Sequence, residues 1–573
     1  MKILAKALVH GASTGALLHA DVPLSFWGGI NSETGEIIDR HHPLSGAYIK
    51  DRILALPGTR GSCSGSLVLI ELLVNGKAPA AIIFRDTEEI VTTGAIVAQI
   101  LLDLSIPILR VSTQQYETLS GEKYAYISGN EIFLSDSPLP LHPSPPPAIP
   151  NIETHISLTE QDKSILNGSY SPAASKAMYI LLQYAHLQDA HQLTPITRAH
   201  IDACIYTGPA SLLIATTFLT HGARVAVPTT LNSISIDQRR WREVGMNETM
   251  AKEANKLANT YVAMGAHNSF TCAPYLLDSD LLPKEGESIG WAESNAVVFA
   301  NSVLGARTQK YPDLIDVCIA LTGRAPLAGT QTVKGRVPGV CVNVRIQKSK
   351  VEEMQDAFWP LLGYAVGKVA GGSIPLITGL EGIKPQPTIS DLKAFGAAFA
   401  TTASAAMFHI AGVTLEAGRH SPAGLKPVAL NEDSLRSALR ELTTATDDTV
   451  GLVSLGNPHF SLEEFARLSD LCTDRHRADG VQIIITTNRK VYAQACAAGY
   501  VSILESFGAD ILTDTCWCMI PEEIIDGSVR NLMTNSAKYA HYAPGIVHRG
   551  VHFGSLGDCL ELVVVSFEYR VLL

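Results

Sequence analysis

The sequence contains no uninterrupted run of about 18 apolar residues, the length that a membrane-spanning helix requires. Charged residues are also scarce, at 17% against 46% hydrophobic residues, and the mean hydropathy is +0.16. This balance excludes an intrinsically disordered chain. A chain of 573 residues exceeds a single hydrophobic core and predicts roughly two to four globular domains. Lys6 and His10 interrupt the apolar residues of the first segment, so no signal peptide is expected.

Positive charge is in deficit, because 44 Lys and Arg residues face 55 Asp and Glu residues. The net charge is −11 and the pI is about 5.9. Proteins that bind nucleic acid through its phosphates carry an excess or a stripe of positive charge. The composition therefore predicts neither a nucleic-acid partner nor a membrane partner. We expect a protein that acts on a small molecule, as a monomer or a small homo-oligomer.

The ten cysteines are scattered, and no two of them form a Cys-x-x-Cys pair. This spacing excludes a disulfide framework and a zinc-ribbon or ferredoxin motif. A reducing compartment, the cytoplasm, is therefore predicted. Most of these cysteines are expected to be small buried apolar side chains, which leaves a few for metal or cluster chemistry.

Proline is concentrated in the segment 137–150, which has seven prolines. Such a segment cannot continue a helix or a central strand, and it favours an extended linker. We therefore predict a small domain at 1–136, a linker at 137–153 and a large catalytic domain at 154–573. The large domain is expected to contain two or more α/β subdomains.

Short apolar runs bounded by turn residues predict strands in the small domain at 52–57 and 80–85. Between them a helix is expected from about Ser66 to the stop signal Asn75-Gly76. In the large domain, helical and strand patterns alternate along the chain. Alternation of this kind predicts an α/β fold with mostly parallel sheets.

Three segments have residue types that suit a functional site. The loop 58–66 is rich in glycine and serine and precedes a helix, so its N–H groups could bind a carboxylate or phosphate. It lacks the Gly-Lys-Ser/Thr of a Walker loop, and a capped turn without a ligand explains it equally well. The segments 271–275 and 514–519 each place a cysteine beside a predicted strand or loop. Thiolates are the usual ligands of iron–sulfur clusters, but this spacing alone is a weak signal.

Polar residues are dense in the segment 291–308, within a run of small residues. Glu293 could act as a general acid or base, and Arg307 could bind a carboxylate. A buried hydrogen-bond network is an equally good interpretation. Near the end of the chain, Lys538 in the segment 536–545 could bind an acidic substrate, although such segments are more often exposed helix ends.

Together these segments resemble the aconitase X family over nearly the whole chain. The resembling stretches of the small domain are HPLSG, GSCSGS, NGKAPAAIIF and TTGAIVA. Those of the large domain are VPTTLNSISIDQRRWREVG, TCAPY, WAESNAVVFANSVLGART, ALTGRAP, DTCWCM and NSAKYAHYAPG. The order and length of these blocks make the resemblance specific, above all WAES followed by FANSVLGART.

The resemblance implies an aconitase-like α/β fold with a large multi-layer catalytic body and a small β-rich swivelling domain. The family has a two-subunit branch that dehydrates mevalonate 5-phosphate. It also has a single-chain branch that dehydrates cis-3-hydroxy-L-proline to Δ1-pyrroline-2-carboxylate. The fused small domain favours the second activity, and so does Cys63, which the loop of the phosphate branch lacks.

The resemblance also implies an iron–sulfur cluster with Cys272 and Cys516 as ligands. A third family cysteine lies in a Gly-Cys-Pro-His motif of the two-subunit branch, where this chain has Asn457. This departure favours a smaller cluster, [2Fe-2S], with another third ligand. The candidates for this ligand are Cys518, Cys341 and Cys63.

The roles of further residues follow from the same resemblance. An iron would act as a Lewis acid on the leaving 3-hydroxyl, and a serine of the small domain would take the proton next to the carboxylate. Ser66 is the first choice for this base, followed by Ser62 and Cys63. Arg307 and Lys538 would hold the carboxylate. The other residues expected to bind the substrate are Thr230, Asn232, Ser294, Asn301 and Ser302.

Two alternatives stay open. Mevalonate 5-phosphate as the substrate requires basic residues for its phosphate, and Arg60 and the run Arg239, Arg240 and Arg242 could serve. An alternative from another class is a non-catalytic, iron-responsive RNA-binding protein, since aconitase relatives include such regulators. The acidic composition and the lack of aromatic–basic stripes argue against it.

Overall fold

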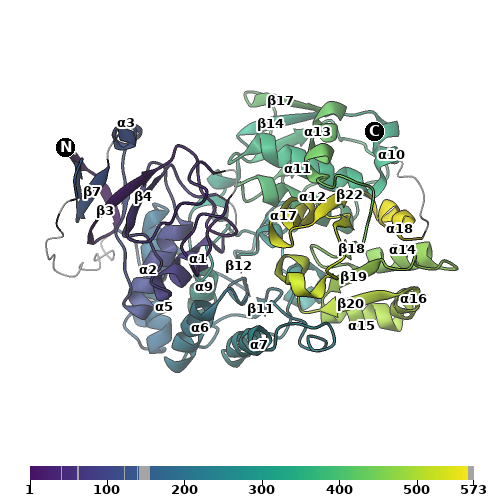
Figure 1. The fold of residues 1–573 in the computed structure, drawn as a ribbon, viewed down its shortest axis with the longest axis horizontal. Helices are drawn as coiled ribbons and strands as arrows, with labels where there is room; N and C mark the ends of the chain where they lie inside the picture. The colour runs from purple at the N-terminus through teal and green to yellow at the C-terminus, as the bar shows by residue number, and fades with distance from the viewer. Residues whose placement is uncertain (40–41, 61–62, 122, 139, 141–154, 565–573) are drawn as a thin grey trace. The chain divides into compact units, whose positions relative to one another are not determined.

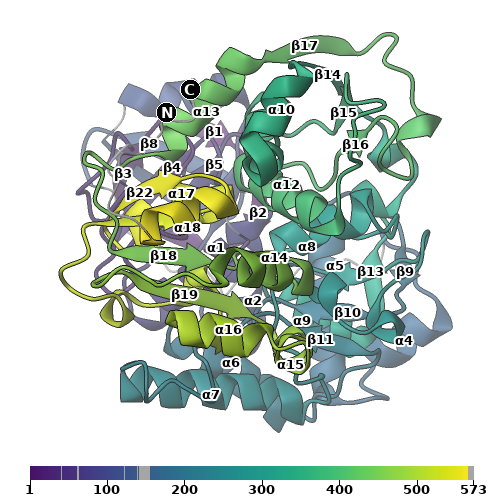
Figure 2. The same cartoon turned by 90° about the vertical axis from the view of Figure 1, so that its right-hand side faces the viewer.

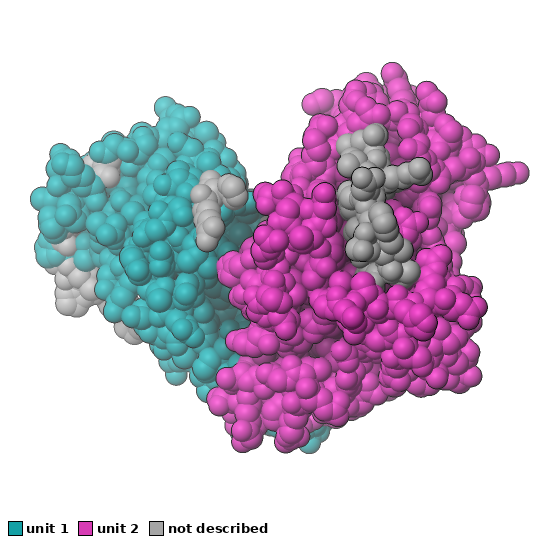
Figure 3. Space-filling model, turned by 45° about the vertical axis from the view of Figure 1, so that its right-hand side comes forward, with its two compact units in different colours: residues 1–227, 263–265, 311–328 teal, residues 228–262, 266–310, 329–573 magenta. Residues whose placement is uncertain are grey.

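The computed structural model describes residues 1–39, 42–60, 63–121, 123–138, 140 and 155–564. It divides into two compact units, which Figure 3 colours separately. Unit 1 comprises residues 1–227, 263–265 and 311–328, and unit 2 comprises residues 228–262, 266–310 and 329–573. Most of the predicted linker lies outside the described residues, so the domain boundaries drawn from it stay predictions. No helix in the described part of the chain has the length and apolar character needed to cross a membrane.

Unit 1 contains an eight-stranded mixed sheet in the order β1-β8-β7-β3-β4-β5-β6-β2. The central strands β3 to β6 run parallel. On one side β2 pairs antiparallel with β6, and on the other β7, β8 and β1 extend the sheet antiparallel from β3. The strands are β1 (Lys2–Leu4), β2 (Lys6–Val9), β3 (Ala12–His19), β4 (Arg52–Leu56), β5 (Ala81–Phe84), β6 (Ile108–Arg110), β7 (Tyr124–Ser128) and β8 (Glu131–Ser135).

The apolar run of β4 is buried on both faces of this sheet. Leu54 and Leu56 face the helices α1 (Gly65–Val74) and α2 (Ile90–Leu102), which lie beside the sheet in Figure 1. Ile53 and Ala55 pack into a second core on the opposite face. Alternate side chains of a strand point to opposite faces, so a strand covered on both sides reads as continuous apolar sequence. The predicted strands at 52–57 and 80–85 and the helix between them are confirmed.

The rest of unit 1 is mainly helical, and α5 packs against α9. A short antiparallel pair, β9 with β13, accompanies these helices. The further elements of unit 1 are α3 (Thr113–Glu117), α4 (Glu160–Leu166), α5 (Pro172–Leu187), β9 (Leu193–Pro195), β10 (Ala199–Ile201), α6 (Pro209–Thr220), α9 (Ile315–Thr322) and β13 (Arg324–Pro326).

Unit 2 contains two sheets whose strands all run parallel, in the orders β16-β15-β14-β17 and β20-β19-β18-β21-β22. These sheets confirm the predicted α/β class. The strands of unit 2 are β11 (Thr229–Leu231), β12 (Gly290–Trp291), β14 (Val340–Arg345), β15 (Pro375–Thr378), β16 (His409–Ile410), β17 (Lys426–Asn431), β18 (Leu452–Leu455), β19 (Gln482–Thr487), β20 (Ala509–Thr513), β21 (Asn531–Thr534) and β22 (Gly550–Phe553).

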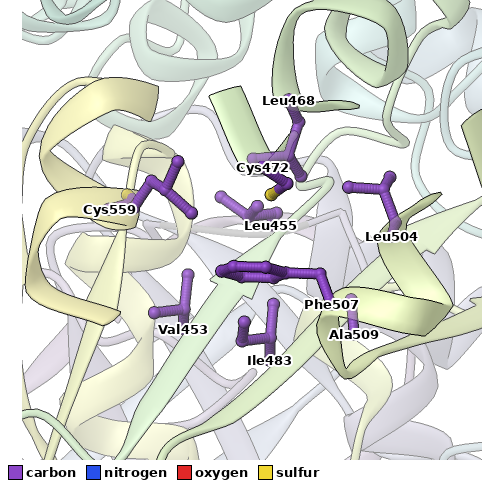
Figure 4. A pocket seen from close by; sticks show the side chains of 10 residues that line it. Val453, Leu455, Leu468, Cys472, Ile483, Leu504, Phe507, Ala509 and Cys559 are labelled. Atoms are coloured by element: carbon purple, nitrogen blue, oxygen red, sulfur yellow. The ribbon is translucent and has the colours of Figure 1, made fainter. Parts of the chain in front are cut away.

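The main helices of unit 2 connect and cover these strands. They are α7 (Glu248–Ala263), α8 (Ser294–Ser302), α10 (Lys348–Met354), α11 (Phe358–Ala370), α12 (Ile389–Thr402), α13 (Glu432–Leu442), α14 (Leu462–Cys472), α15 (Arg489–Ala497), α16 (Tyr500–Phe507), α17 (Ala537–Ile546) and α18 (Leu556–Val564). Figure 2 shows α14 and α16 alongside β18 and β19. Apolar side chains of α14, α15, α16 and α18 build one core with the five-stranded sheet. Figure 4 shows part of this core, where Phe507 lies among Leu455, Cys472 and Ile483.

The strand order of the five-stranded sheet reverses between β18 and β21. In open parallel sheets, ligands bind outside the carboxyl ends of the strands at such a switch point. The loop 456–459 follows β18, and the segment that begins α17 follows β21. The segment 514–519 follows β20, whose last residue is Thr513, and contains a short 3-10 turn (Trp517–Met519). The fold thus points to this edge as the place for a site.

Candidate functional site

Three thiols meet at this edge of unit 2. Cys516 follows β20, Cys518 lies two residues later, and Cys272 comes from the loop after α7. Hydrogen bonds from the Cys272 and Cys518 thiols lower the pKa of Cys516 well below its ordinary value, and this effect outweighs its burial. Burial, followed by the hydrogen bond to Cys516, raises the pKa of Cys272. The hydrogen bond to Cys516, followed by burial, raises the pKa of Cys518. The sulfur of Cys516 therefore accepts hydrogen bonds from both of the other thiols.

A buried ion pair lies beside these thiols. Lys538, in the first turn of α17, donates from Nζ to Oε1 of Glu293 at 2.8 Å. Burial opposes the charge of Lys538, but Glu293 and the three thiols hold its pKa well above the ordinary value. Burial alone would raise the pKa of Glu293, yet Lys538 brings it below the ordinary value. Glu293 is therefore ionised, which suits a base or an electrostatic partner better than an acid.

Amide side chains hold Glu293 in place. Asn295 donates from Nδ2 to Glu293 Oε1 at 2.7 Å, and Asn232 donates from Nδ2 to Oε2 at 3.4 Å. The same Nδ2 of Asn295 donates to the carbonyl oxygen of Cys272 at 3.0 Å. Tyr275 donates from its hydroxyl to Asn295 Oδ1 at 2.8 Å. These contacts tie the carboxylate to the cysteine-bearing loop, and Ser294 adds a weaker bond at 3.4 Å.

The loop after β18 contacts the thiols from another side. Asn457 donates from Nδ2 to the Cys518 sulfur at 3.0 Å, and its carbonyl oxygen accepts a hydrogen bond from Ser536, the N-cap of α17. His459, which is fully buried, donates its backbone N–H to the Cys272 sulfur at 3.3 Å. Burial lowers the pKa of the His459 ring, which therefore stays neutral. The loop supplies amide donors to two of the three sulfurs.

The donor set at this edge fits an iron–sulfur cluster. Three sulfurs converge, and the thiolate form that a cluster requires is already favoured at Cys516. Two buried oxygens of the same segments, Asn457 Oδ1 and Thr515 Oγ1, have no hydrogen-bond partner among the described residues. Across those residues, no three His, Cys, Asp or Glu side chains are spaced as a finished cage for a single metal ion. The site therefore has the right ligand chemistry without a completed coordination geometry.

The predicted substrate-binding residues of unit 2 fall into two groups. Asn232, Ser294 and Lys538 belong to the network around Glu293. The side chain of Asn301 is used within the protein, because it donates to the carbonyls of Thr308 and Ala406 and accepts from the N–H of Thr308. Asn301 therefore holds neighbouring segments together through hydrogen bonds, and its contact with the substrate stays a prediction.

The remaining candidates of unit 2 have other neighbours. Ser302 accepts the N–H of Phe408 at 2.9 Å. Arg307 is half-buried and donates from Nη1 to the carbonyl of Gln331 at 3.4 Å. Thr230 is buried in β11. Cys341, a candidate third ligand, lies in β14 with its sulfur 3.9 Å from the Thr378 hydroxyl. Cys518 is thus the candidate that the structure brings to Cys516.

The candidate bases belong to unit 1. Ser66 is fully buried in the first turn of α1, and its hydroxyl donates to the carbonyl oxygens of Cys63 (3.1 Å) and Asp313 (3.3 Å). Cys63 is buried just before this helix. Ser62 lies outside the described residues. In this arrangement the Ser66 hydroxyl acts as a donor, and its assignment as the base stays a prediction.

Sequence reasoning passed over several residues that the structure places at the site. His459, Asn295 and Tyr275 contact or support the cysteine-bearing loops. The signal for His459 was its place in the Gly-Asn-Pro-His segment, which was considered only for its missing cysteine. Asn295 follows Glu293 closely in the WAES block, and Tyr275 ends the TCAPY block.

Comparison with known proteins agrees with this picture. Four family descriptions match the chain: Aconitase X swivel domain (residues 2–135), first domain (155–334), second domain (338–440) and third domain (450–565). A cis-3-hydroxy-L-proline dehydratase from Pseudomonas aeruginosa is 49% identical over 98% of this chain and 96% of its own length. Another dehydratase of this name, from Hypocrea jecorina, is 47% identical over 97% of this chain and 94% of its own length.

A solved structure supports the fold assignment. The crystal structure of Thermococcus kodakaraensis aconitase X in its holo form superposes with a TM-score of 0.64 and 29% identity. The superposition covers 71% of this chain and 100% of the Thermococcus chain. The predicted aconitase-like fold and the predicted resemblance are both confirmed, and the family implies an iron–sulfur cluster. This chain belongs to the aconitase X family.

Proposed function

We propose that this chain is a hydro-lyase that dehydrates cis-3-hydroxy-L-proline to Δ1-pyrroline-2-carboxylate. The observation that carries the proposal is the convergence of Cys272, Cys516 and Cys518 beside the Lys538–Glu293 pair. Such a site combines thiolate ligands for a cluster with a cation for a substrate carboxylate. The two dehydratases of this name that match the chain over nearly its full length support the choice of substrate.

Each side chain has a defined task in this reaction. When bound, the cluster supplies a Lewis-acidic iron that assists the departure of the 3-hydroxyl as water. Lys538 binds the carboxylate, helped by the N–H groups that open α17, and Glu293 keeps its ammonium in position. Ser66, in its alkoxide form, takes the proton from the carbon next to the carboxylate and passes it to the departing hydroxyl, which leaves as water. The enamine that results then tautomerises to the cyclic imine.

The cluster in this proposal is [2Fe-2S], with Cys518 as the third protein ligand. Asn457 stands where the two-subunit branch has a cysteine, and it donates to Cys518 at 3.0 Å. A hydrogen bond to a ligand sulfur is a usual way for a protein to tune a cluster. Iron and acid-labile sulfide counted per chain, with the electron paramagnetic resonance spectrum of the reduced protein, test the cluster type.

The basic residues available to a phosphorylated substrate are committed elsewhere. Arg60 pairs with Asp39, and Arg240 pairs with Asp510 and Glu243. Arg239 donates to Thr513 and stacks on Tyr492, and Arg242 lies over Trp241. These pairings disfavour mevalonate 5-phosphate, and they equally disfavour an RNA-binding surface built from these arginines.

Turnover by anaerobically purified protein tests the proposal. Cis-3-hydroxy-L-proline and mevalonate 5-phosphate are assayed side by side, and the cyclic imine is trapped with a reductase. We expect imine from the first substrate only. A protein that carries iron and sulfide but forms no imine would refute the choice of substrate.

Three further predictions are tested separately. Limited proteolysis tests the domain boundaries, cell fractionation tests the cytoplasmic location, and light scattering tests the monomeric or small homo-oligomeric state.

A further inference from the structure

The imidazole of His459 bridges the two segments that hold Cys272 and Cys516. Its Nδ1 lies 3.1 Å from the hydroxyl oxygen of Thr271, the residue before Cys272. Its Nε2 lies 2.8 Å from the carbonyl oxygen of Thr515, the residue before Cys516. The backbone N–H of His459 also donates to the Cys272 sulfur at 3.3 Å. One residue therefore contacts both cysteine-bearing segments next to their thiols.

The partners of the ring determine its tautomer. A carbonyl oxygen only accepts, so Nε2 carries the hydrogen that Thr515 accepts. In the neutral ring Nδ1 then has a lone pair, which accepts the hydroxyl hydrogen of Thr271. The Thr271 oxygen in turn accepts the N–H of Ala273 at 3.0 Å. Each donor of this bridge therefore faces an acceptor, so the hydrogen bonds fix the tautomer of the ring as well as its distances to the two segments.

The backbone of His459 is itself anchored. The buried ammonium of Lys393 donates to the His459 carbonyl oxygen at 3.0 Å and pairs with Glu464. Glu464 accepts the N–H of Ser461, the N-cap of α14, at 2.7 Å. These contacts connect the loop to α12 and α14. The backbone of His459 therefore cannot shift without losing its contact with α12, which is itself tied to the start of α14.

We propose that His459 is a positioning residue for the iron–sulfur cluster, which sets the separation of Cys272 and Cys516 through Thr271 and Thr515. This inference rests on the proposed function, because it concerns the same cluster. His459 does not bind iron in this arrangement, since both ring nitrogens are used within the protein. Residues that orient metal ligands typically contribute on the order of 10- to 100-fold to metal affinity.

The experiment measures iron loss from the anaerobically purified holoprotein to a chelator, followed by visible absorbance and by iron content. His459→Phe keeps a flat ring and removes both hydrogen bonds, and we expect iron loss to be faster by about 10- to 100-fold. Thr271→Val removes one arm and should give a smaller increase, whereas Thr271→Ser keeps the hydroxyl and should match wild type. His459→Phe combined with Thr271→Val should add little to His459→Phe alone, because both remove the same arm.

His409 provides a matched control. It is also fully buried in unit 2, and its Nε2 donates to a carbonyl oxygen, that of Arg336, at 2.9 Å. We expect His409→Phe to lower stability without faster iron loss. Equal acceleration in His409→Phe and His459→Phe would overturn the inference, as would unchanged iron loss in His459→Phe. A wild-type protein that takes up no cluster would instead overturn the proposed function, and the inference with it.

Discussion

Lys538 and Glu293, 245 residues apart in the chain, form a hydrogen-bonded ion pair of 2.8 Å with side chains only 13% and 10% exposed. A buried charge that loses its partner is strongly destabilising, whereas removal of both charges is tolerated. The pair therefore links the stability of unit 2 to the chemistry of its candidate site, and the two contributions are separable by mutation.

We predict that Lys538→Met lowers stability by about 3–5 kcal/mol, because Glu293 is left buried and unpaired. The double variant Lys538→Met with Glu293→Gln should regain most of that stability. Turnover should be low in both variants. Relative to wild type, kcat/KM should fall on the order of 100-fold in each, as expected for a lost charge-assisted contact of about 3 kcal/mol. Denaturant unfolding and steady-state kinetics measure the two effects. Recovered turnover in the double variant would remove Lys538 from the proposed carboxylate site.

We predict that Cys272→Ser, Cys516→Ser and Cys518→Ser each lose the visible absorbance and the iron of the holoprotein, because a serine hydroxyl is a poor substitute for a thiolate. Cys341→Ser should retain both, since the Cys341 sulfur lies in β14 with the Thr378 hydroxyl as its neighbour. Iron and sulfide analysis after anaerobic purification decides between them. Iron retained in Cys518→Ser and lost in Cys341→Ser would reverse the choice of third ligand.

Gly456 is predicted to be intolerant of any side chain. Its φ is +93°, and a Cβ there would lie 2.1 Å from the Thr486 carbonyl oxygen. Gly480 provides the comparison, with a φ of +81° and no heavy atom within 4 Å of the added Cβ. Gly480→Ala should cost only the left-handed backbone strain, about 1–2 kcal/mol. Gly456→Ala should cost about 1–3 kcal/mol more, because backbone must move.

The same pair of variants tests the loop after β18. Iron content should fall in Gly456→Ala alone, since displacement of this loop moves Asn457 and His459 away from the sulfurs. Similar iron content and similar unfolding midpoints in Gly456→Ala and Gly480→Ala would show that the close approach of Gly456 to Thr486 affects neither iron binding nor stability.

His409 is predicted to make unit 2 sensitive to acid. Burial lowers its pKa to about 4, from an ordinary value near 6.5, and its neighbours are Arg336, Glu416 and His420. A depressed histidine pKa contributes stability that is present above about pH 6.5 and is lost as the pH falls towards 4. His409→Gln keeps a donor for the Arg336 carbonyl but does not titrate. The stability difference between wild type and this variant should therefore shrink by up to about 3 kcal/mol between pH 7 and pH 4. Unfolding at several pH values measures it, and a constant difference would contradict the prediction.

Ser66→Ala is predicted to abolish most turnover while the iron content stays at the wild-type level, because Ser66 is proposed to take the substrate proton. A general base typically contributes about 10²- to 10⁴-fold. The variant also removes hydrogen bonds to the carbonyls of Cys63 and Asp313, so an unfolding curve must accompany the kinetics. Full turnover in a folded Ser66→Ala protein would move the assignment to Ser62 or Cys63.

Local sequence patterns were sufficient for much of the fold. The run at 52–57 predicted β4, because a strand buried on both faces is apolar throughout. Asn75-Gly76 predicted the end of α1, because glycine readily adopts the left-handed backbone that ends a helix, and Gly76 indeed has a φ of +63°. The segment 514–519 was expected beside a predicted strand or loop, and only the structure shows that β20 ends at Thr513 and that the cysteines follow it in a turn. Ends of elements depend on tertiary contacts that such patterns do not contain.

The sequence by itself determined the α/β class, because it depends on local periodicity, and the family resemblance, because it depends on ordered motifs. That resemblance in turn implied Cys272 and Cys516 as cluster ligands. Only the tertiary structure decided that Cys518 joins Cys516, that Lys538 pairs with Glu293 and that His459 contacts both cysteine-bearing segments. The strand order β20-β19-β18-β21-β22 brings these segments to one edge. That order results from packing among strands spread over residues 452–553, and the Lys538–Glu293 pair joins positions 245 residues apart, so no local pattern specifies which segments become neighbours.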